Sequence, residues 1–480
     1  MELHPDNIIE NLDQIGRKEG LVLLREWIDS SSEQILRQKA LEYYGSIDTG
    51  KNFKFFEHLF LSDENLNLRL IAGQILKEKY WDNKKLISLL EYTLRKVDNI
   101  KQRLFAVKTF ASIDNVKTRK LIVEYLKELI KKEFKDKVKE FPKEIYTFNY
   151  NETIPGLFLD ICINLLLYTH YTNKCGYHVT VRKGKIISLN CESSNLGRFS
   201  EITELNSLKN LEHLQLERNK INNIDGIQIL EKLRTLDLSH NKLVKIENLE
   251  SLTNLEELNL ANNEIRRIDG LDSLKKLKKL SLNDNILEDI DNLTHLTNLE
   301  ELNLSHNAIS DIKNLDNLSQ LIRLNLSFNQ IEKITGIKSL KNLQWLYIND
   351  NKINQIEELS TLHKLKGLYL SNNLIVKIEG LENLINLRKL ELSNNKITRI
   401  GGLRALNNLQ ELYLDNNNIK EFEGLENLTD LIMLHLGRNE ITKFRNENID
   451  CLKNLNFLFL NENPLDQKSW EQFKKRFKYP

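Results

Sequence analysis

Side chains that can bind a metal gather in one stretch of the chain, which contains His170, Cys175, His178 and Cys191. Imidazole and thiolate groups are common zinc ligands, so a metal-dependent hydrolase is one chemistry that they could support. Zinc modules usually supply their ligands in pairs such as Cys-x-x-Cys, and this stretch has no such pair. We therefore expect no metal and no cofactor here, and a metal-dependent hydrolase ranks third among the hypotheses for function.

Common catalytic signatures are also missing from the sequence. It contains no glycine-rich phosphate-binding loop, no Gly-x-Ser-x-Gly and no His-Glu-x-x-His. Each of these motifs places a nucleophile, a phosphate or a metal at a fixed point of a turn or helix, so their absence removes the usual routes to hydrolysis and phosphoryl transfer. The sequence therefore predicts a protein that is not an enzyme.

Aromatic residues recur at a constant step along the second half of the chain, which suits recognition of a partner. Along one column with this step, the first six residues are small or polar, and the last six are Tyr347, Tyr369, Glu391, Tyr413, His435 and Phe459. Large apolar groups are costly to expose, and aromatic residues dominate the energetics of interfaces. Strands favour Tyr and Phe in any case, but this preference does not explain why they gather in one half. With neighbouring columns included, the predicted protein-binding residues are Phe328, Trp345, Tyr347, Tyr369, Glu391, Tyr413, Met433, His435, Phe457 and Phe459.

These residues must be positioned by a repeat, Leu-x-x-Leu-x-Leu-x-x-Asn, which runs from Leu211 to near Leu465. The opening leucine returns at equal steps from Leu211 through Leu233 and onward to Leu431, and a further copy follows at Leu455 after a slightly longer step. Self-similarity at this period predicts an α/β solenoid, the leucine-rich-repeat horseshoe. In a strand of period two, the residue between the two leucines points away from the core. The aromatic column is therefore expected on the concave face.

One asparagine closes the strand of every repeat, from Asn219 to Asn463. A side-chain amide can satisfy the backbone groups that are left unpaired where the chain leaves a strand. Every repeat needs the same turn, so we interpret this column as structural and not as a binding site.

The N-terminal part of the chain, residues 1–143, is predicted to be helical. Arg37, Arg69 and Arg103 are each followed by an alanine three positions later, and they lie at nearly equal steps that match the length of a helix pair with its turns. This pattern resembles HEAT-like helical repeats, and an irregular helical bundle is the alternative. From Lys117 to Lys143 we predict a basic amphipathic helix. It could meet anionic lipid or nucleic acid, but acidic residues interrupt its charge, so a solvated outer face is favoured.

Three segments are expected along the chain. Residues 1–143 form the HEAT-like helical domain, 144–176 a junction with a buried apolar helix, and 177–480 the solenoid with an N-terminal hairpin cap and a C-terminal helical cap. The apolar run at 154–168 is about 15 residues long, whereas a membrane span needs about 20. It is therefore expected to be buried within the protein.

The first residues, the cysteine content and the net charge of the chain favour a cytoplasmic protein. The first residues, MELHPDNIIENLDQ, are polar and acidic, unlike a secretory signal peptide. The four cysteines form no recognisable disulfide framework, which favours a reducing compartment. Charged residues make up 29% of the chain but nearly cancel, leaving a formal charge of +1. No nucleic-acid partner and no membrane span are expected.

The 22-residue pattern resembles the leucine-rich-repeat class of regulatory subunits of type-one serine/threonine protein phosphatase. Stretches such as 379–384 and 434–441 are very similar to it, although internalins and other scaffolds share the repeat. The resemblance implies that the concave face binds an enzyme through aromatic and acidic residues. In this sequence these are Trp345, Tyr347, Tyr369, Glu391 and Tyr413. The helical N-terminal domain departs from that family.

Two hypotheses for function follow. The first is a non-enzymatic scaffold or adaptor that binds a protein on the concave face, with a second partner available to the helical domain. The alternative is a regulatory subunit of a phosphatase or another enzyme. Fold alone does not decide between them.

Overall fold

A computed structural model describes residues 4–477 of the chain. The chain divides into two compact units, of which the first ends at Ile187 and the second begins at Ser188. Strand β2 (Lys185–Asn190) crosses this boundary.

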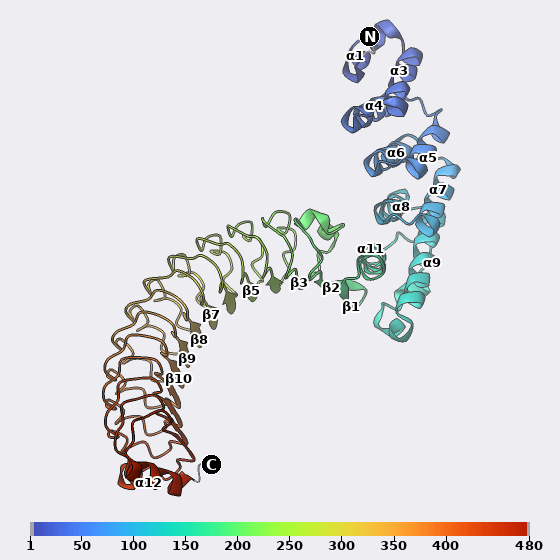
Figure 1. Cartoon of the computed structure of the whole chain (residues 1–480). Helices are drawn as coiled ribbons and strands as arrows, with labels where there is room; N and C mark the ends of the chain where they lie inside the picture. Colours follow the sequence, from blue (N-terminus) through green and yellow to red (C-terminus); the bar gives the residue numbers. More distant parts are fainter. Residues whose placement is uncertain (1–3, 478–480) are drawn as a thin grey trace. The chain divides into compact units, whose positions relative to one another are not determined.

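The first unit is built from paired helices, as the arginine spacing predicts. Helix α3 packs on α4, α5 on α6, and α7 on α8, and α11 packs on both α8 and α9. Figure 1 shows these pairs stacked in chain order. The elements are α1 (Pro5–Glu10), α2 (Leu12–Ile15), α3 (Arg17–Ser30), α4 (Gln34–Ile47), α5 (Phe53–Ser62), α6 (Leu66–Lys79), α7 (Lys84–Lys96), α8 (Ile100–Ile113), α9 (Val116–Glu133), α10 (Glu144–Thr147), α11 (Gly156–His170) and β1 (His178–Arg182).

Asparagines set the start of four consecutive helices. The side chains of Asn65, Asn83, Asn99 and Asn115 accept backbone N–H groups in the first turns of α6, α7, α8 and α9. Each oxygen satisfies a donor that has no partner inside the helix, which stabilises a helix by about 1 kcal/mol. The helical repeats therefore begin at positions that the sequence marks.

The prediction of a basic helix from Lys117 to Lys143 is wrong for the second half of this segment. Helix α9 ends at Glu133, and the 3-10 helix Lys135–Glu140 follows it. Phe134 leaves the helical conformation with a φ of −131°. Its ring packs 5.4 Å from that of Phe141 and 4.8 Å from that of Tyr168. The packing of this half-buried ring in a local aromatic cluster accompanies the end of the helix, which helical periodicity does not reveal.

The apolar run at 154–168 becomes α11, the most buried helix of the first unit. Ile161, Cys162 and the leucines 165–167 are fully buried. Its polar residue Asn164 accepts the N–H of Ile186 at 2.9 Å and donates to the carbonyl of Asp160 at 2.8 Å. A buried amide must find such partners, and these bonds explain how Asn164 is accommodated in an apolar helix. Within the described residues, no helix is long and apolar enough to span a membrane.

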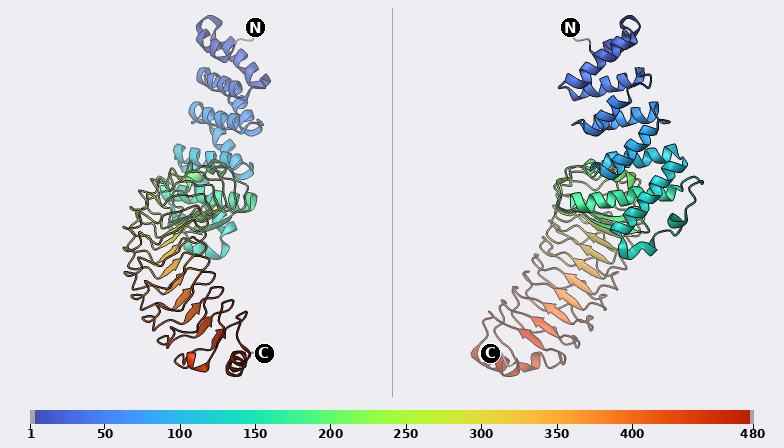
Figure 2. Two further views of the ribbon diagram at one scale, coloured as in Figure 1. Left: turned by 60° about the vertical axis from the view of Figure 1, so that its left-hand side comes forward. Right: turned by 90° about the vertical axis from the view of Figure 1, so that its right-hand side faces the viewer.

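The second unit is a solenoid whose short parallel strands lie in register, one in each repeat. Residues 188–190 of β2 pair with β3, and each later strand pairs with the next through its central leucine. The strands line the inner side of the arc of this unit (Figures 1 and 2). They are β3 (His213–Gln215), β4 (Thr235–Asp237), β5 (Glu257–Asn259), β6 (Lys279–Ser281), β7 (Glu301–Asn303), β8 (Arg323–Asn325), β9 (Trp345–Tyr347), β10 (Gly367–Tyr369), β11 (Lys389–Glu391), β12 (Glu411–Tyr413), β13 (Met433–His435) and β14 (Phe457–Phe459).

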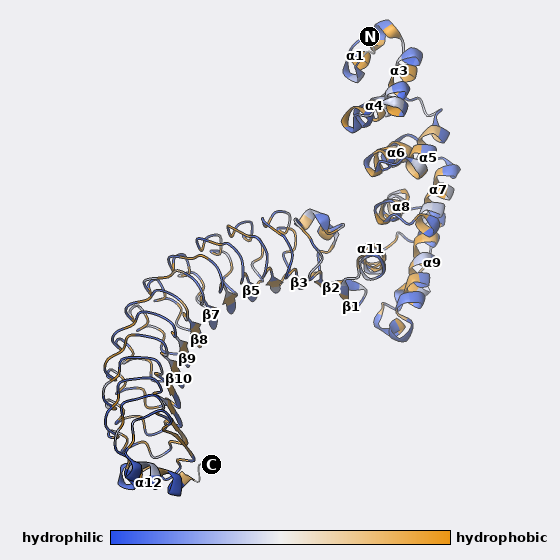
Figure 3. Ribbon diagram, viewed as in Figure 1, coloured by the Kyte–Doolittle hydropathy of each residue, from blue (hydrophilic) through white to orange (hydrophobic). Residues whose placement is uncertain are grey.

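The core of the solenoid is a continuous column of leucine and isoleucine. In a typical repeat, Leu387, Leu390 and Leu392 are fully buried, as is Ile397 on the returning segment. Hydrophobic and hydrophilic stretches alternate along each turn (Figure 3). The returning segments consist of turns and a few 3-10 helices, with no α-helix between residues 188 and 466. The predicted solenoid is confirmed.

The asparagine column joins neighbouring repeats. Asn395 accepts the N–H of Ile375 at 3.0 Å and donates to the carbonyls of Leu370, Leu392 and Ser393. The residues from Asn241 to Asn439 make the same pattern, whereas Asn219 accepts two N–H groups and Asn463 donates to two carbonyls. All of them are buried except Asn307, which is partly exposed. The column therefore satisfies backbone groups at the turn, as its recurrence predicts.

A final helix covers the last repeat. Helix α12 (Gln467–Phe477) buries Phe473, whose ring lies 5.7 Å from that of Phe444. The hydroxyl of Ser469 accepts the N–H of Phe444 at 2.9 Å. A solenoid requires a terminal element of this kind to cover its core, and the sequence marks it by aromatic residues at helical spacing.

Candidate protein-binding face

The register of the strands brings the predicted column onto one face. Tyr347 pairs with Tyr369, Glu391 with Tyr413, and His435 with Phe459. The central leucines of these strands are at most 3% exposed and point into the core. Side chains alternate along a strand, so the column lies on the opposite, concave face.

Rings in this column stack on one another along the solenoid. The centroids of Tyr347 and Tyr369 lie 4.4 Å apart with an interplanar angle of 18°. His435 stacks between Tyr413 and Phe459, with centroid distances of 4.6 and 4.1 Å. These distances follow from the spacing of neighbouring strands, which is about 4.8 Å. The two stacks are separated by strand β11, which contributes Glu391 instead of a ring.

Lys389 closes the gap between the two stacks. Its Nζ lies 5.6 Å from the ring centroid of Tyr369 and 4.8 Å from that of Tyr413, within the range of cation–π contacts. The same atom lies 3.0 Å from a carboxylate oxygen of Glu391 and 3.2 Å from one of Glu411. Partial burial alone would lower the pKa of Lys389, but the two carboxylates outweigh it and raise that pKa above its usual value. We call the resulting surface the aromatic ladder, which consists of Tyr347, Tyr369, Lys389, Tyr413, His435 and Phe459.

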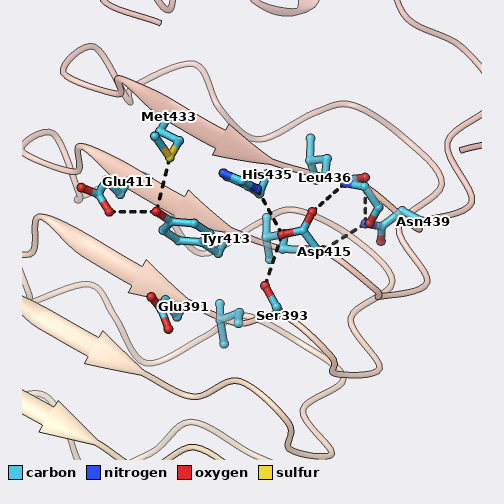
Figure 4. A network of polar contacts seen from close by, with 12 residues as sticks. Glu391, Ser393, Glu411, Tyr413, Asp415, Met433, His435, Leu436 and Asn439 are labelled. Carbon is cyan, nitrogen blue, oxygen red and sulfur yellow. Dashed lines mark hydrogen bonds and ion pairs between the residues drawn. The ribbon is translucent and has the colours of Figure 1, made fainter. Parts of the chain in front are cut away.

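Polar contacts hold the C-terminal end of the ladder in place (Figure 4). The hydroxyl of Tyr413 lies 3.0 Å from Glu411 Oε2 and 3.3 Å from the sulfur of Met433. Nδ1 of His435 lies 3.5 Å from Oδ2 of Asp415. Burial lowers the pKa of His435 in spite of the nearby carboxylate of Asp415, so the imidazole is neutral at pH 7. The C-terminal end of the ladder therefore presents uncharged rings beside the carboxylates of Glu411 and Asp415.

Trp345 lies over a glycine that sequence reasoning did not single out. Gly367 pairs with Trp345 in the sheet, and a Cβ built on it would lie 2.4 Å from Cε3 of Trp345 and 2.9 Å from Cε2 of Tyr369. The missing side chain lets both rings lie close to strand β10. A glycine in the interior of a strand is itself a signal of close approach by another group.

Gly367→Ala is expected to push the Trp345 ring off β10. The added methyl group overlaps the indole, so the ring must move and its fluorescence emission should shift. Emission spectra of the two proteins measure this effect. The same substitution in a Trp345→Phe background is the control, and an equal spectral change there would show that another tryptophan had responded.

Two of the predicted residues lie apart from the stacked rings. Phe328 is in the turn after β8, has a φ of 56° and stacks on His306 at 4.0 Å. Phe457 is 50% exposed in the last strand, β14. Phe328 therefore lies in the turn beyond its strand, as its place in the repeat predicts, and not in the ladder.

The family of the second unit is decided by sequence and structure together. A family model of paired leucine-rich repeats matches residues 231–273, 253–295, 297–339, 341–383 and 385–427. The crystal structure of an internalin from Listeria monocytogenes is 30% identical in sequence, covering 60% of this chain and 87% of that one, with a TM-score of 0.53. The chain is a leucine-rich-repeat protein.

Another leucine-rich-repeat protein, from Leptospira interrogans, gives a similar result. It is 28% identical over 58% of this chain and 79% of its own, with a TM-score of 0.55. No curated protein matches the chain in sequence. All of the residues matched by the family model lie in the solenoid.

The histidines and cysteines near the middle of this leucine-rich-repeat protein do not converge on a common point. Cys175 Sγ lies 3.7 Å from His170 Nε2, but both side chains are partly or fully exposed. Over residues 4–477, no group of three or more His, Cys, Asp or Glu side chains is placed to hold a metal ion.

Proposed function

We propose that this leucine-rich-repeat protein is a non-enzymatic scaffold or adaptor that binds a protein partner through the aromatic ladder. The observation that carries this proposal is that the rings lie on the face opposite the buried leucines, where the core does not need them. Stacked rings also lose little conformational entropy on binding, because neighbours already restrict their rotamers.

The surroundings of the ladder favour a folded protein or a peptide over a charged polymer. Glu391, Glu411 and Asp415 lie beside it, together with the exposed Arg438, and Lys389 lies within it. A nucleic acid would require an excess of positive charge. Aromatic side chains accompanied by charges of both signs are typical of protein interfaces.

The proposed location is the cytoplasm. Cys162, Cys175 and Cys451 are free thiols, and burial raises the pKa of the Cys162 thiol to about 12, which keeps it unreactive. Free thiols are stable in a reducing compartment.

A regulatory subunit of a phosphatase is the second candidate function. The carboxylate of Glu391 between Tyr369 and Tyr413 is the arrangement that the resemblance to phosphatase regulators implies. Phosphatase activity that co-purifies with the chain, and that changes when the chain is removed, distinguishes this function from a passive scaffold.

Replacing Tyr347, Tyr369 and Tyr413 together with Ala is expected to weaken partner binding by about 100-fold or more, because clustered aromatic residues act as interface hot spots. All three side chains are only partly buried, so the melting temperature should change little. Affinity capture from native lysate, with quantitative mass spectrometry, compares the variant with the wild type.

The matched control is Asn259, Ser281 and Asn303 changed together to Ala, which alters the same column in the polar half of the face. This control should retain the partner. A partner held equally by the tyrosine variant would remove the ladder from the proposed interface.

A further inference from the structure

The helical unit contains a column of arginines in which one member differs from the others. Arg37 and Arg69 occupy equivalent positions on α4 and α6. Nη2 of Arg37 donates to Asp63 at 2.8 Å, and Nη1 of Arg69 donates to Gln102 at 3.0 Å. Arg37 thereby contacts the loop before α6, and Arg69 contacts helix α8. These two arginines therefore have a structural role.

Arg103, the third member, lacks that partner. Its Nε donates to the carbonyl of Val97 at 2.6 Å, which fixes the side chain. Among residues 4–477, neither of its terminal nitrogens has a hydrogen-bonding or ion-pair partner in the protein. A guanidinium carries its donors in a planar fork that matches an oxyanion. The guanidinium of Arg103 is therefore held in place, while its terminal N–H groups have no protein partner among the described residues.

Arg103 lines a cavity of about 370 Å³ in the helical unit. The walls come from α7, α8, α9, α11 and the residues that follow α11. A volume of this size lies in the usual range for small-molecule sites. Ile100 and Leu129 supply an apolar side, and both are buried. The cavity can therefore hold an organic group next to an unpaired cation.

The charges around the cavity leave an excess of positive charge. Arg95 is paired with Glu128 at 2.6 Å, and Lys174 with Asp98 at 2.7 Å. The lining residues that remain charged after these two pairs are Arg103 and Lys132. Lys132 is exposed and lies 3.2 Å from Glu133, which is outside the lining. The lining side chains sum to +2, and with Glu133 included the excess around the cavity is +1.

A second donor without a protein partner lines the same cavity. Tyr125 is only 7% exposed, and within the described residues its hydroxyl makes no hydrogen bond. Burial raises the pKa of Tyr125 to about 12, so its hydroxyl keeps its proton and can donate to an anion. The side chain of Tyr125 lines the cavity, so its hydroxyl is available to donate to a bound molecule.

We propose that this cavity binds a small phosphomonoester. Arg103 would donate two parallel N–H groups to the phosphate, Tyr125 would donate its hydroxyl, and Lys132 would supply the second positive charge. Ile100 and Leu129 would contact the ester group. A phosphate offers three acceptor oxygens to these donors, whereas a carboxylate offers only two.

Calorimetric titration of the full chain with inorganic phosphate and with phenyl phosphate tests the proposal, with chloride at matched ionic strength as the reference. Phenyl phosphate should bind more tightly than inorganic phosphate, because its ring reaches the apolar side. Arg103→Gln should weaken the binding of phenyl phosphate by about tenfold or more. Lys117→Gln makes the same charge change at an exposed site outside the cavity and should leave affinity unchanged.

Two further variants keep the test decisive if Arg103→Gln does not fold. Arg103→Lys retains the charge without the fork and should bind phenyl phosphate more weakly than the wild type. Lys132→Gln alters an exposed residue and should weaken binding severalfold. Circular dichroism establishes which variants are folded. Unchanged affinity in the folded variants, or equal loss in Lys117→Gln, would overturn the proposal. Tighter binding of a phosphotyrosine peptide than of phenyl phosphate would also overturn it, by assigning the site to a peptide.

Discussion

Asn395→Ala is expected to lower the free energy of unfolding by about 3 kcal/mol, because it leaves a buried donor without a partner. The carbonyls of Leu370 and Leu392 keep an amide partner from Asn373 and Asn417 respectively. The N–H of Ile375, by contrast, loses its only side-chain acceptor inside the solenoid. A buried donor without a partner costs about 1–3 kcal/mol, and the other lost bonds add to this.

Urea denaturation measures the change in stability, and hydrogen exchange at the Ile375 amide locates it. Asn408→Ala is the matched control, because Asn408 is exposed and donates a single bond to the carbonyl of Ile385. The control should cost less than about 1 kcal/mol. Equal losses in the two variants would show that the buried column has no special role.

Gly402→Ala is expected to cost about 2 kcal/mol, because both the backbone conformation and the space at this position exclude a side chain. Gly402 has a φ of +68°, a conformation that disfavours a side chain by about 1–2 kcal/mol. A Cβ at this position would also lie 2.2 Å from the carbonyl oxygen of Ile378, so the backbone of one repeat must shift. Thermal and urea unfolding of the purified chain measure the loss.

The chain supplies its own controls for this substitution. Gly401 is the preceding residue, and a Cβ added to it would have no atom within 4 Å, so Gly401→Ala should be nearly neutral. Asn292 and Asn314 stand at the position equivalent to Gly402 in other repeats, also with positive φ, and donate to carbonyls of the preceding repeat. Gly402→Asn should therefore cost less than Gly402→Ala. The reverse order would contradict this account of the turn.

Both stability predictions bear on the proposed function. The aromatic ladder is a surface of side chains from neighbouring strands, and its ring distances depend on the regular spacing of those strands. A solenoid transmits its geometry from one repeat to the next, because each repeat contacts only its neighbours. Disturbing one turn near β11 is therefore expected to change the ladder as well as the stability.

The sequence by itself determined the repeat, the strand register and the face on which the aromatic residues lie. A constant repeat length and the alternation of leucines leave a single arrangement in which every leucine is buried. The recurring asparagine likewise predicted its own role, because one turn geometry is needed in every repeat.

Contacts between residues distant in sequence were decided only by the tertiary structure. Lys389 joins two ring stacks because β11 lies between β10 and β12, and Trp345 covers Gly367 because the two strands pair in register. Phe134 ends α9 by packing against rings from other segments. Only the folded structure shows that the terminal nitrogens of Arg103 have no protein partner among the described residues. The spacing in the sequence predicts the same role for Arg103 as for Arg37 and Arg69. Periodicity records what all repeats share, whereas these features depend on what one repeat has and its neighbours lack.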